Sequence, residues 1–175
     1  PYLRQILVTI LIFLIVFTGL RFTLQSFLVH DICMEPSFTG GQYLLVNKLT
    51  YHFHSPQRGD VVILWPPKSS NYPFIKRVIG LPGEEIKIED GEVYIRQGND
   101  FKLLEEPSYI AQADYSGHWI IPEDEYFVLG DNRNVADDSH RWGTVPGGNI
   151  IGKVWLCYWP PGEWGLSPRY SVAME

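Results

Sequence analysis

The stretch "FIKRVIGLPGE", residues 74–84, decides the fold. Its β-branched side chains predict a strand over residues 74–80, and the Pro-Gly pair that follows predicts a turn. Successive side chains of a strand point to opposite faces, so either Lys76 or Arg77 points toward whichever face is buried. Burial favours the neutral amine of a lysine, and such an amine can act as the base for a Ser or Cys nucleophile. The alternative is a lysine at the sheet edge whose ammonium group reaches water.

Short apolar runs on both sides of this stretch predict further strands separated by turns. The segment "EIKIEDGEVYI" (85–95) predicts a hairpin, because Asp-Gly is a favoured two-residue turn. Residues 96–124 are polar and weakly patterned, and we expect an insertion or long loop region there. The other predicted strands lie in "QYLLVNKL" (42–49), "DVVILW" (60–65), "EYFVLGDN" (125–132) and "GKVWLCYWP" (152–160). The sequence therefore predicts a mainly β fold, with antiparallel strands in a coiled sheet or barrel.

The N-terminal segment "QILVTILIFLIVFTGL" (5–20) carries no charge and is bracketed by Arg4 and Arg21. As a helix it reaches roughly 24 Å, slightly less than the ~30 Å hydrocarbon core of a bilayer, and flanking residues can cover the difference. A cleaved signal peptide would end in an Ala-x-Ala type of site, which is absent, and a buried core helix would show a polar face. We expect a transmembrane anchor and juxtamembrane segment over residues 1–28, followed by a β-rich domain over residues 29–175.

The composition excludes several classes of function. The chain has 14 Lys and Arg residues against 20 Asp and Glu residues, a formal net charge of −6. It has no dense basic run, which argues against a nucleic-acid partner. His52 and His54 have no third potential ligand nearby in the sequence, so we expect no metal site. No motif indicates a cofactor.

The segment "DICMEPSF" (31–38) follows the predicted anchor and places Cys33 before a Glu-Pro pair. Three roles are open for this cysteine: a small buried side chain, one half of a disulfide with Cys157, or a nucleophile. Cys157 itself lies in an apolar aromatic strand and is expected to be buried. Another segment, "LGDNRNVADDSHRWG" (129–143), gathers acidic, amide and basic side chains in one loop.

These segments, in this order, resemble the type I signal peptidases. That family has a Ser-Met-x-Pro motif after its membrane anchor, a "KR" strand leading into "GLPG", and a "GDNR…DSR…WG" loop. The counterparts here are "CMEP" (33–36), "GDVV" (59–62), "FIKRVIGLPGE" (74–84) and "GDNRNVADDSHRWG" (130–143). The resemblance covers most of residues 5–160. It implies a single-pass protein of the cell membrane that acts on preprotein signal peptides and has its catalytic domain on the extracytoplasmic side. It also implies an endopeptidase that cleaves after small residues, at Ala-x-Ala sites, with a nucleophile/lysine dyad.

The resemblance also implies roles for single residues. Cys33 stands at the position of the nucleophilic serine, and Lys76 at the position of the general base. The supporting residues implied are Arg77, Asp131 and Asp138, with Arg141 as a substitute for a family arginine whose position His140 occupies. The residues implied to face the substrate are Val29, Asp31, Met34, Phe38, Phe74 and Ile75.

The chain departs from the family pattern at Cys33, Asp31, Ala136 and His140. Asp31 replaces a small or hydroxyl residue, and an ionised carboxylate there opposes the negative charge that develops at an oxyanion hole. Ala136 replaces a serine that orients the lysine in the family. We expect reduced rather than absent peptide-bond cleavage. A second hypothesis is a catalytically impaired homologue that acts as a membrane-anchored binding or assembly protein.

Overall fold

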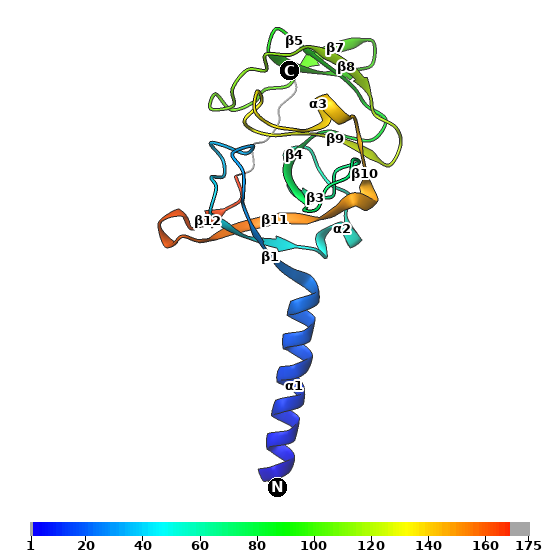
Figure 1. Ribbon diagram of the computed structural model, residues 1–175. Coiled ribbons are helices and arrows are strands. Elements are labelled where there is room, and N and C mark those ends of the chain that lie inside the picture. The colour runs from blue at the N-terminus through cyan, green and yellow to red at the C-terminus, as the bar shows by residue number, and fades with distance from the viewer. Residues whose placement is uncertain (1, 169–175) are drawn as a thin grey trace.

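The computed structural model describes residues 2–168 and consists of a β-rich body from which one N-terminal helix projects (Figure 1). The helix, α1 (Tyr2–Thr23), contains 22 residues, which span about 33 Å at ~1.5 Å per residue. Its apolar side chains are exposed on all sides, and it is long and apolar enough to cross a membrane. The predicted apolar helix is confirmed, and it extends three residues beyond segment 5–20 at each end, which removes the expected shortfall in length.

Within residues 2–168, the larger sheet contains eight strands, in the order β1-β2-β11-β3-β4-β9-β10 with β12 paired to β11. Every strand pair is antiparallel. The strands are β1 (Leu24–Leu28), β2 (Tyr43–Asn47), β3 (Val61–Leu64), β4 (Phe74–Gly80), β9 (Glu125–Leu129), β10 (Val145–Pro146), β11 (Ile150–Trp159) and β12 (Gly165–Leu166). The strand predicted over residues 74–80 is thus confirmed at both ends, and it lies between β3 and β9. The helix α1 runs directly into β1, so it is joined to the sheet without a linker.

Both faces of β3 are covered, because the larger sheet curls into a half-barrel. Val61 and Ile63 pack into an apolar cluster that contains Cys33, whereas Val62 and Leu64 pack into a cluster on the opposite face. This alternation follows the pleat of the strand. It also explains why the run "VVIL" is apolar at every position, as in other strands that are buried on both sides.

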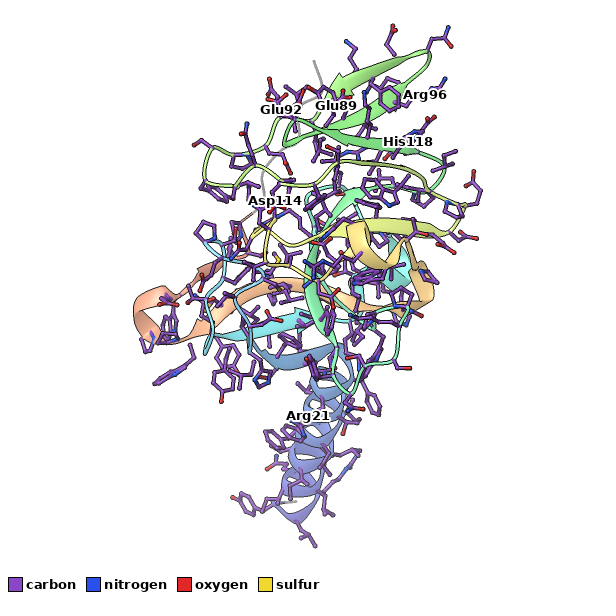
Figure 2. The ribbon with its side chains drawn as sticks, turned by 45° about the horizontal axis from the view of Figure 1, so that its top comes forward. Arg21, Glu89, Glu92, Arg96, Asp114 and His118 are labelled. Atoms are coloured by element: carbon purple, nitrogen blue, oxygen red, sulfur yellow. The ribbon has the colours of Figure 1, made fainter. Side chains whose placement is uncertain are left out.

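The smaller sheet has the order β7-β6-β5-β8 and lies at the end of the body farthest from α1 (Figure 1). Its strands are β5 (Glu85–Glu89), β6 (Glu92–Gln97), β7 (Asp100–Leu103) and β8 (Gly117–Ile120). The predicted hairpin is confirmed: Asp90 and Gly91 both have positive φ, 51° and 84°, as a type I′ turn requires. In Figure 2 the labelled charged side chains Glu89, Glu92, Arg96 and His118 lie on this distal sheet.

An apolar cluster joins the two sheets. Ile79 of β4 and Phe127 of β9 pack with Ile86 and Ile95 of the distal sheet, and all four side chains are fully buried. The two sheets therefore share one core, and β4 contributes to it at the strand end beyond Lys76.

The segment 96–124 differs from the expectation of a long loop. It contains β7 and β8, and its longest part outside helices and strands is residues 104–116. Both strands are four residues long and lie at the two edges of the small sheet, where three residues of β7 and two residues of β8 are exposed. Such short edge strands leave little periodicity in the sequence, because pairing with β5 and β6 rather than local pattern fixes them.

The remaining elements are single turns of helix: α2 (Thr50–Phe53), α3 (Ser139–Trp142), and the 3₁₀ turns η1 (Gly147–Asn149) and η2 (Pro161–Glu163). Of these, α3 directly follows the loop that supports the candidate site. Pro1 and residues 169–175, the last seven of the predicted β-rich domain, lie outside the described part of the chain.

Candidate active site

The β4 residue Lys76 and the loop residue Cys33 are in direct contact. Lys76 Nζ lies 2.9 Å from Cys33 Sγ and donates a second hydrogen bond to the carbonyl oxygen of Ile75 at 3.0 Å. The two side chains are 1% and 5% exposed. Strand alternation predicted that one of Lys76 and Arg77 would be buried, but the structure buries both side chains. The curled sheet explains this difference, because it buries both faces of β4.

The surroundings of the pair are largely apolar. Lys76 Nζ lies 5.2 Å from the centre of the Phe74 ring, and among residues 2–168 no carboxylate forms an ion pair with it. Burial raises the pKa of the Cys33 thiol to about 12, with the positive charge of Lys76 acting in the opposite direction. The thiol is therefore protonated at neutral pH, and the nearest group able to accept its proton is the Lys76 amine.

Arg77 joins β4 to its neighbours. Its Nε and Nη2 donate to the two carboxylate oxygens of Asp131 at 2.8 and 2.6 Å, and both side chains are almost fully buried. Nη1 donates to the carbonyl oxygens of Gly59 and Pro168, each at 2.9 Å. Nη2 also reaches Ser37 Oγ, in the loop that carries Cys33, at 3.4 Å. The bidentate pair joins β4 to the loop after β9, and the contact with Ser37 joins it to the loop that carries Cys33.

The loop after β9 holds the backbone of the segment that carries Cys33, through a residue that sequence reasoning did not select. The backbone N–H of Asn132 donates to the carbonyl oxygen of Cys33 at 3.0 Å, and Asn132 Nδ2 donates to that of Ile32 at 3.1 Å. Gly130 lies so close that a Cβ built there would be 2.5 Å from the Cys33 carbonyl oxygen. The "GDNR" motif was the available signal for Asn132, but it did not indicate what Asn132 contacts.

Arg133 links the same loop to the connection between β7 and β8. Its guanidinium pairs with the Glu106 carboxylate through both terminal nitrogens, with Nη1 at 2.6 Å from Oε2. Its Nε donates to the carbonyl oxygen of Gly130 at 3.2 Å. Glu106 belongs to the segment expected as a loop, so its supporting role was also missed.

Asp138, at the C-terminal end of the loop after β9, bonds back to the start of that loop. Its Oδ2 accepts from the backbone N–H of Gly130 at 2.9 Å, and its Oδ1 accepts from His140 Nδ1 at 2.6 Å. Arg141 was expected to stand in for the family arginine beside Asp138, but the structure places the His140 ring there. His140 fills that place, because its position in the first turn of α3 directs both its backbone N–H and its ring toward the capping carboxylate. Arg141 is exposed, and its Nε donates to His140 Nε2 at 3.1 Å.

A cleft of about 160 Å³ opens over the pair. Its lining consists of Asp31, Ile32, Cys33, Tyr72, Phe74, Lys76, Val135 and Asp137. Asp137 forms an ion pair with Lys68 at the mouth. Larger hollows of about 540 and 570 Å³ lie elsewhere on the molecule, but neither contains Cys33 or Lys76.

Of the six residues expected to face a substrate, Asp31 and Phe74 line the cleft. The other four are fully buried in the apolar cluster around Cys33: Val29, Met34, Phe38 and Ile75. Sequence reasoning missed Ile32, Tyr72, Val135 and Asp137, whose positions on three loops leave no periodic signal.

Known proteins resemble this chain over most of its length. A model of the family described as "Signal peptidase, peptidase S26" matches residues 2–159. The chain belongs to this signal peptidase family. Signal peptidase I of Leptolyngbya laminosa is 40% identical over 164 residues, covering 87% of this chain and 79% of that protein. Probable signal peptidase I-2 of Synechocystis is 37% identical over 155 residues, covering 85% and 69%. Thylakoidal processing peptidase 1 of Arabidopsis thaliana is 35% identical over 148 residues, covering 77% and 42%.

In this signal peptidase family member, two departures from the motif pattern lie next to the pair. Ala136 is fully buried in the cluster around Cys33 and offers no hydroxyl to the lysine. The Asp31 carboxylate does not turn away from the site: its Oδ1 accepts from the backbone N–H of Cys33 at 3.3 Å. The amide that would polarise a substrate carbonyl is thus already bonded to a carboxylate.

The disulfide left open by the sequence does not form in this signal peptidase family member, because Cys33 and Cys157 are both free thiols. Cys157 is buried, and its Sγ donates to the carbonyl oxygen of Trp159 at 3.3 Å. Among residues 2–168 no group of three or more His, Cys, Asp or Glu side chains is placed to hold a metal ion. Cys33 is therefore available as a thiol beside its lysine.

Proposed function

We propose that the chain is a membrane-bound endopeptidase that removes signal peptides by cleaving after small residues, at Ala-x-Ala sites. Cys33 is the nucleophile and Lys76 the general base. The observation that carries this proposal is the 2.9 Å contact between two buried groups, Lys76 Nζ and Cys33 Sγ, beneath an open cleft. Its family membership supports the substrate class, because signal peptidases remove signal peptides from preproteins.

The geometry supports the following sequence of steps. The Lys76 amine accepts the thiol proton while Sγ attacks the scissile carbonyl carbon, which forms the S–C bond of a tetrahedral intermediate. The intermediate collapses, the C–N bond breaks, and the leaving amine takes the proton from Lys76. The signal peptide is then held as a thioester. A water molecule that loses a proton to Lys76 attacks the thioester, releasing the peptide carboxylate and restoring the thiol.

The size of the cleft supports a preference for small side chains. Its volume of about 160 Å³ is far below the ~300–1,000 Å³ of typical small-molecule pockets. A cluster of buried apolar side chains, among them Val29, Met34 and Ile75, fills the space around Cys33. A large side chain beside the scissile bond would have to displace part of this packed core, at a cost of about 1–3 kcal/mol or more.

The arrangement of the chain supports a membrane location for the reaction. We infer that residues 1–28 form the anchor and juxtamembrane segment, and that residues 29–175 form a catalytic domain on the extracytoplasmic side of the cell membrane. Because α1 runs directly into the sheet, the cleft would stay at a fixed distance from the bilayer. The apolar segment of a signal peptide would bring its cleavage site to the same region.

The test is cleavage of a preprotein with an Ala-x-Ala site by the detergent-solubilised full chain, beside Cys33→Ser and Cys33→Ala. Cleavage at the site by the parent or Cys33→Ser, with none by Cys33→Ala, supports the proposal. If parent and Cys33→Ser are both inactive on a preprotein that a related signal peptidase cleaves, the enzymatic proposal fails. The chain would then be a binding or assembly protein.

A further inference from the structure

The Asp31 side chain occupies the one backbone donor that the nucleophile offers to the cleft. Its Oδ1 lies 3.3 Å from the amide nitrogen of Cys33 and accepts its hydrogen bond. Asp31 is exposed and lines the same cleft as Cys33 and Lys76. Among residues 2–168 it forms no ion pair with a lysine, arginine or histidine. The carboxylate is therefore held in the cleft mainly by this amide.

The amide itself cannot move aside. The carbonyl groups on both sides of it are bonded to the loop after β9, that of Ile32 to Asn132 Nδ2 and that of Cys33 to the Asn132 N–H. The peptide group between Ile32 and Cys33 is thus fixed in direction, and its N–H points toward Asp31. The exposed side chain is the part that is free to rotate.

The position of the carboxylate opposes two charges that the reaction must create. When Sγ attacks a carbonyl carbon, negative charge develops on the carbonyl oxygen, and a preorganised N–H near it lowers the barrier. A carboxylate on that N–H both blocks the donor and repels the oxyanion. The same carboxylate also disfavours the thiolate, since its hydrogen bond and charge add to burial in raising the pKa of the Cys33 thiol.

We propose that Asp31 is an autoinhibitory residue: in the free protein its carboxylate fills the oxyanion site, and cleavage requires it to leave the Cys33 N–H. This inference rests on the proposed function, because it assumes that a peptide carbonyl is delivered to Cys33. It predicts that Asp31 slows formation of the tetrahedral intermediate, and that it leaves binding of the peptide itself unchanged.

A pair of ligands separates these two effects. A peptide aldehyde ending in Ala-x-alaninal can form a tetrahedral adduct: Sγ bonds to the aldehyde carbon, the thiol proton passes to Lys76, and the aldehyde oxygen takes up the negative charge. That oxygen then lies at the site that Asp31 occupies. The matching peptide alcohol binds the same cleft but cannot form the bond. The ratio of their dissociation constants therefore reports on formation of the tetrahedral adduct, apart from binding of the peptide.

The experiment measures both ligands on the full-length protein in detergent, with Asp31→Asn, Asp31→Ser and Asp31→Glu. Asp100→Asn, an exposed residue on β7, makes the same change in charge far from the cleft and is the matched control. We expect Asp31→Asn and Asp31→Ser to bind the aldehyde at least about tenfold more tightly, since one oxyanion donor is worth roughly 10²–10³ in rate. Alcohol binding should not change. Asp31→Glu and Asp100→Asn should behave like the parent.

The outcomes distinguish this inference from the proposed function. If parent and variants bind both ligands with an unchanged ratio, Asp31 is not inhibitory, and the assignment of Cys33 and the cleft still stands. If Asp31→Asn and Asp31→Ser lose the alcohol as well, Asp31 supports the cleft structurally, which also overturns the inference. If neither ligand binds any form, including the parent, the cleft does not accept this peptide class, and the proposed function falls with it.

Discussion

Lys76 is the residue on which the proposed chemistry depends most directly. Its amine is the nearest proton acceptor to the Cys33 thiol, and the Ile75 carbonyl oxygen fixes its direction. Methionine has a similar length and suits an apolar site, so Lys76→Met removes the base with little change in packing.

We predict that Lys76→Met lowers kcat for an Ala-x-Ala peptide by at least about 100-fold, the lower range for loss of a general base. Alkylation of Cys33 by iodoacetamide should slow as well, because the charge that favours the thiolate is gone. Lys87→Met, on the distal sheet, is the control and should match the parent in both assays. A Lys76→Met protein that cleaves at the parental rate would remove Lys76 from the mechanism.

The raised pKa of the Cys33 thiol predicts how the free energy of unfolding depends on pH. Burial raises the pKa of this thiol from 9.0 to about 12 in the folded protein, the nearby Lys76 charge offsetting only part of this effect. As pH rises above 9.0, the unfolded chain loses the thiol proton first. The stability contributed by the neutral thiol is therefore fully present below about pH 9 and is lost as pH rises toward about 12.

The measurement is the free energy of unfolding of the parent minus that of Cys33→Ala, from about pH 8 to about pH 10.5. This difference should shrink as pH increases. A difference that stays constant or grows over the range would mean that the folded protein holds the thiol as a thiolate, paired with the Lys76 ammonium.

At the scale of the elements, the loop after β9 carries most of the support for the site. It holds the Cys33 segment through Asn132, β4 through Asp131, and the connection between β7 and β8 through Arg133. Its position thus determines where the nucleophile lies relative to β4.

Breaking the Arg77–Asp131 pair should damage this support. Arg77→Met leaves the Asp131 carboxylate buried without its partner, which costs about 3–5 kcal/mol of folding free energy. Arg96→Met removes an exposed pair with Glu85 and should leave the free energy of unfolding nearly unchanged, because solvent screens exposed ion pairs. Denaturant unfolding of the detergent-solubilised chain measures both values. Equal losses in the two variants would show that the buried pair is not a structural anchor.

The close approach of Gly130 gives a second prediction at this scale. In Gly130→Ala, the new Cβ would overlap Ala136 Cβ and lie 2.5 Å from the Cys33 carbonyl oxygen. We expect a loss of about 1–3 kcal/mol in stability, as for other overpacked sites, with a loss of cleavage because the nucleophile is displaced. Gly148→Ala is the control, since nothing lies within 4 Å of its Cβ position. Normal cleavage by Gly130→Ala would contradict the close packing of the two loops.

The sequence predicted elements with strong local patterns and missed those fixed by distant partners. The β4 strand, the β5–β6 hairpin and the apolar helix follow from β-branched runs, an Asp-Gly turn and uncharged length. The motifs placed Cys33 with Lys76. They could not show that the Asn132 side chain holds a residue 100 positions away, because that contact depends on the closed fold. Nor could they choose between His140 and Arg141, since one helical turn decides which of them faces Asp138.

At the scale of the whole molecule, one apolar helix projects from the body, and the distal sheet carries the labelled charged side chains farthest from it (Figure 2). We predict that protease added to spheroplasts digests the β-rich body while a cytoplasmic protein in the same cells survives. The body would then lie on the side where exported preproteins emerge. Survival of the body until the membrane is opened with detergent would reverse the proposed orientation.

The central claim is that Cys33 forms a covalent thioester with the signal peptide, and intact-mass spectrometry tests it most directly. The detergent-solubilised chain is mixed with an Ala-x-Ala peptide and quenched in acid at short times. The account predicts an added mass equal to the N-terminal product minus one water, located on Cys33 and removed by hydroxylamine. Cys33→Ala should show none. Cleavage without any adduct on Cys33, or with an adduct that persists in Cys33→Ala, would contradict the account.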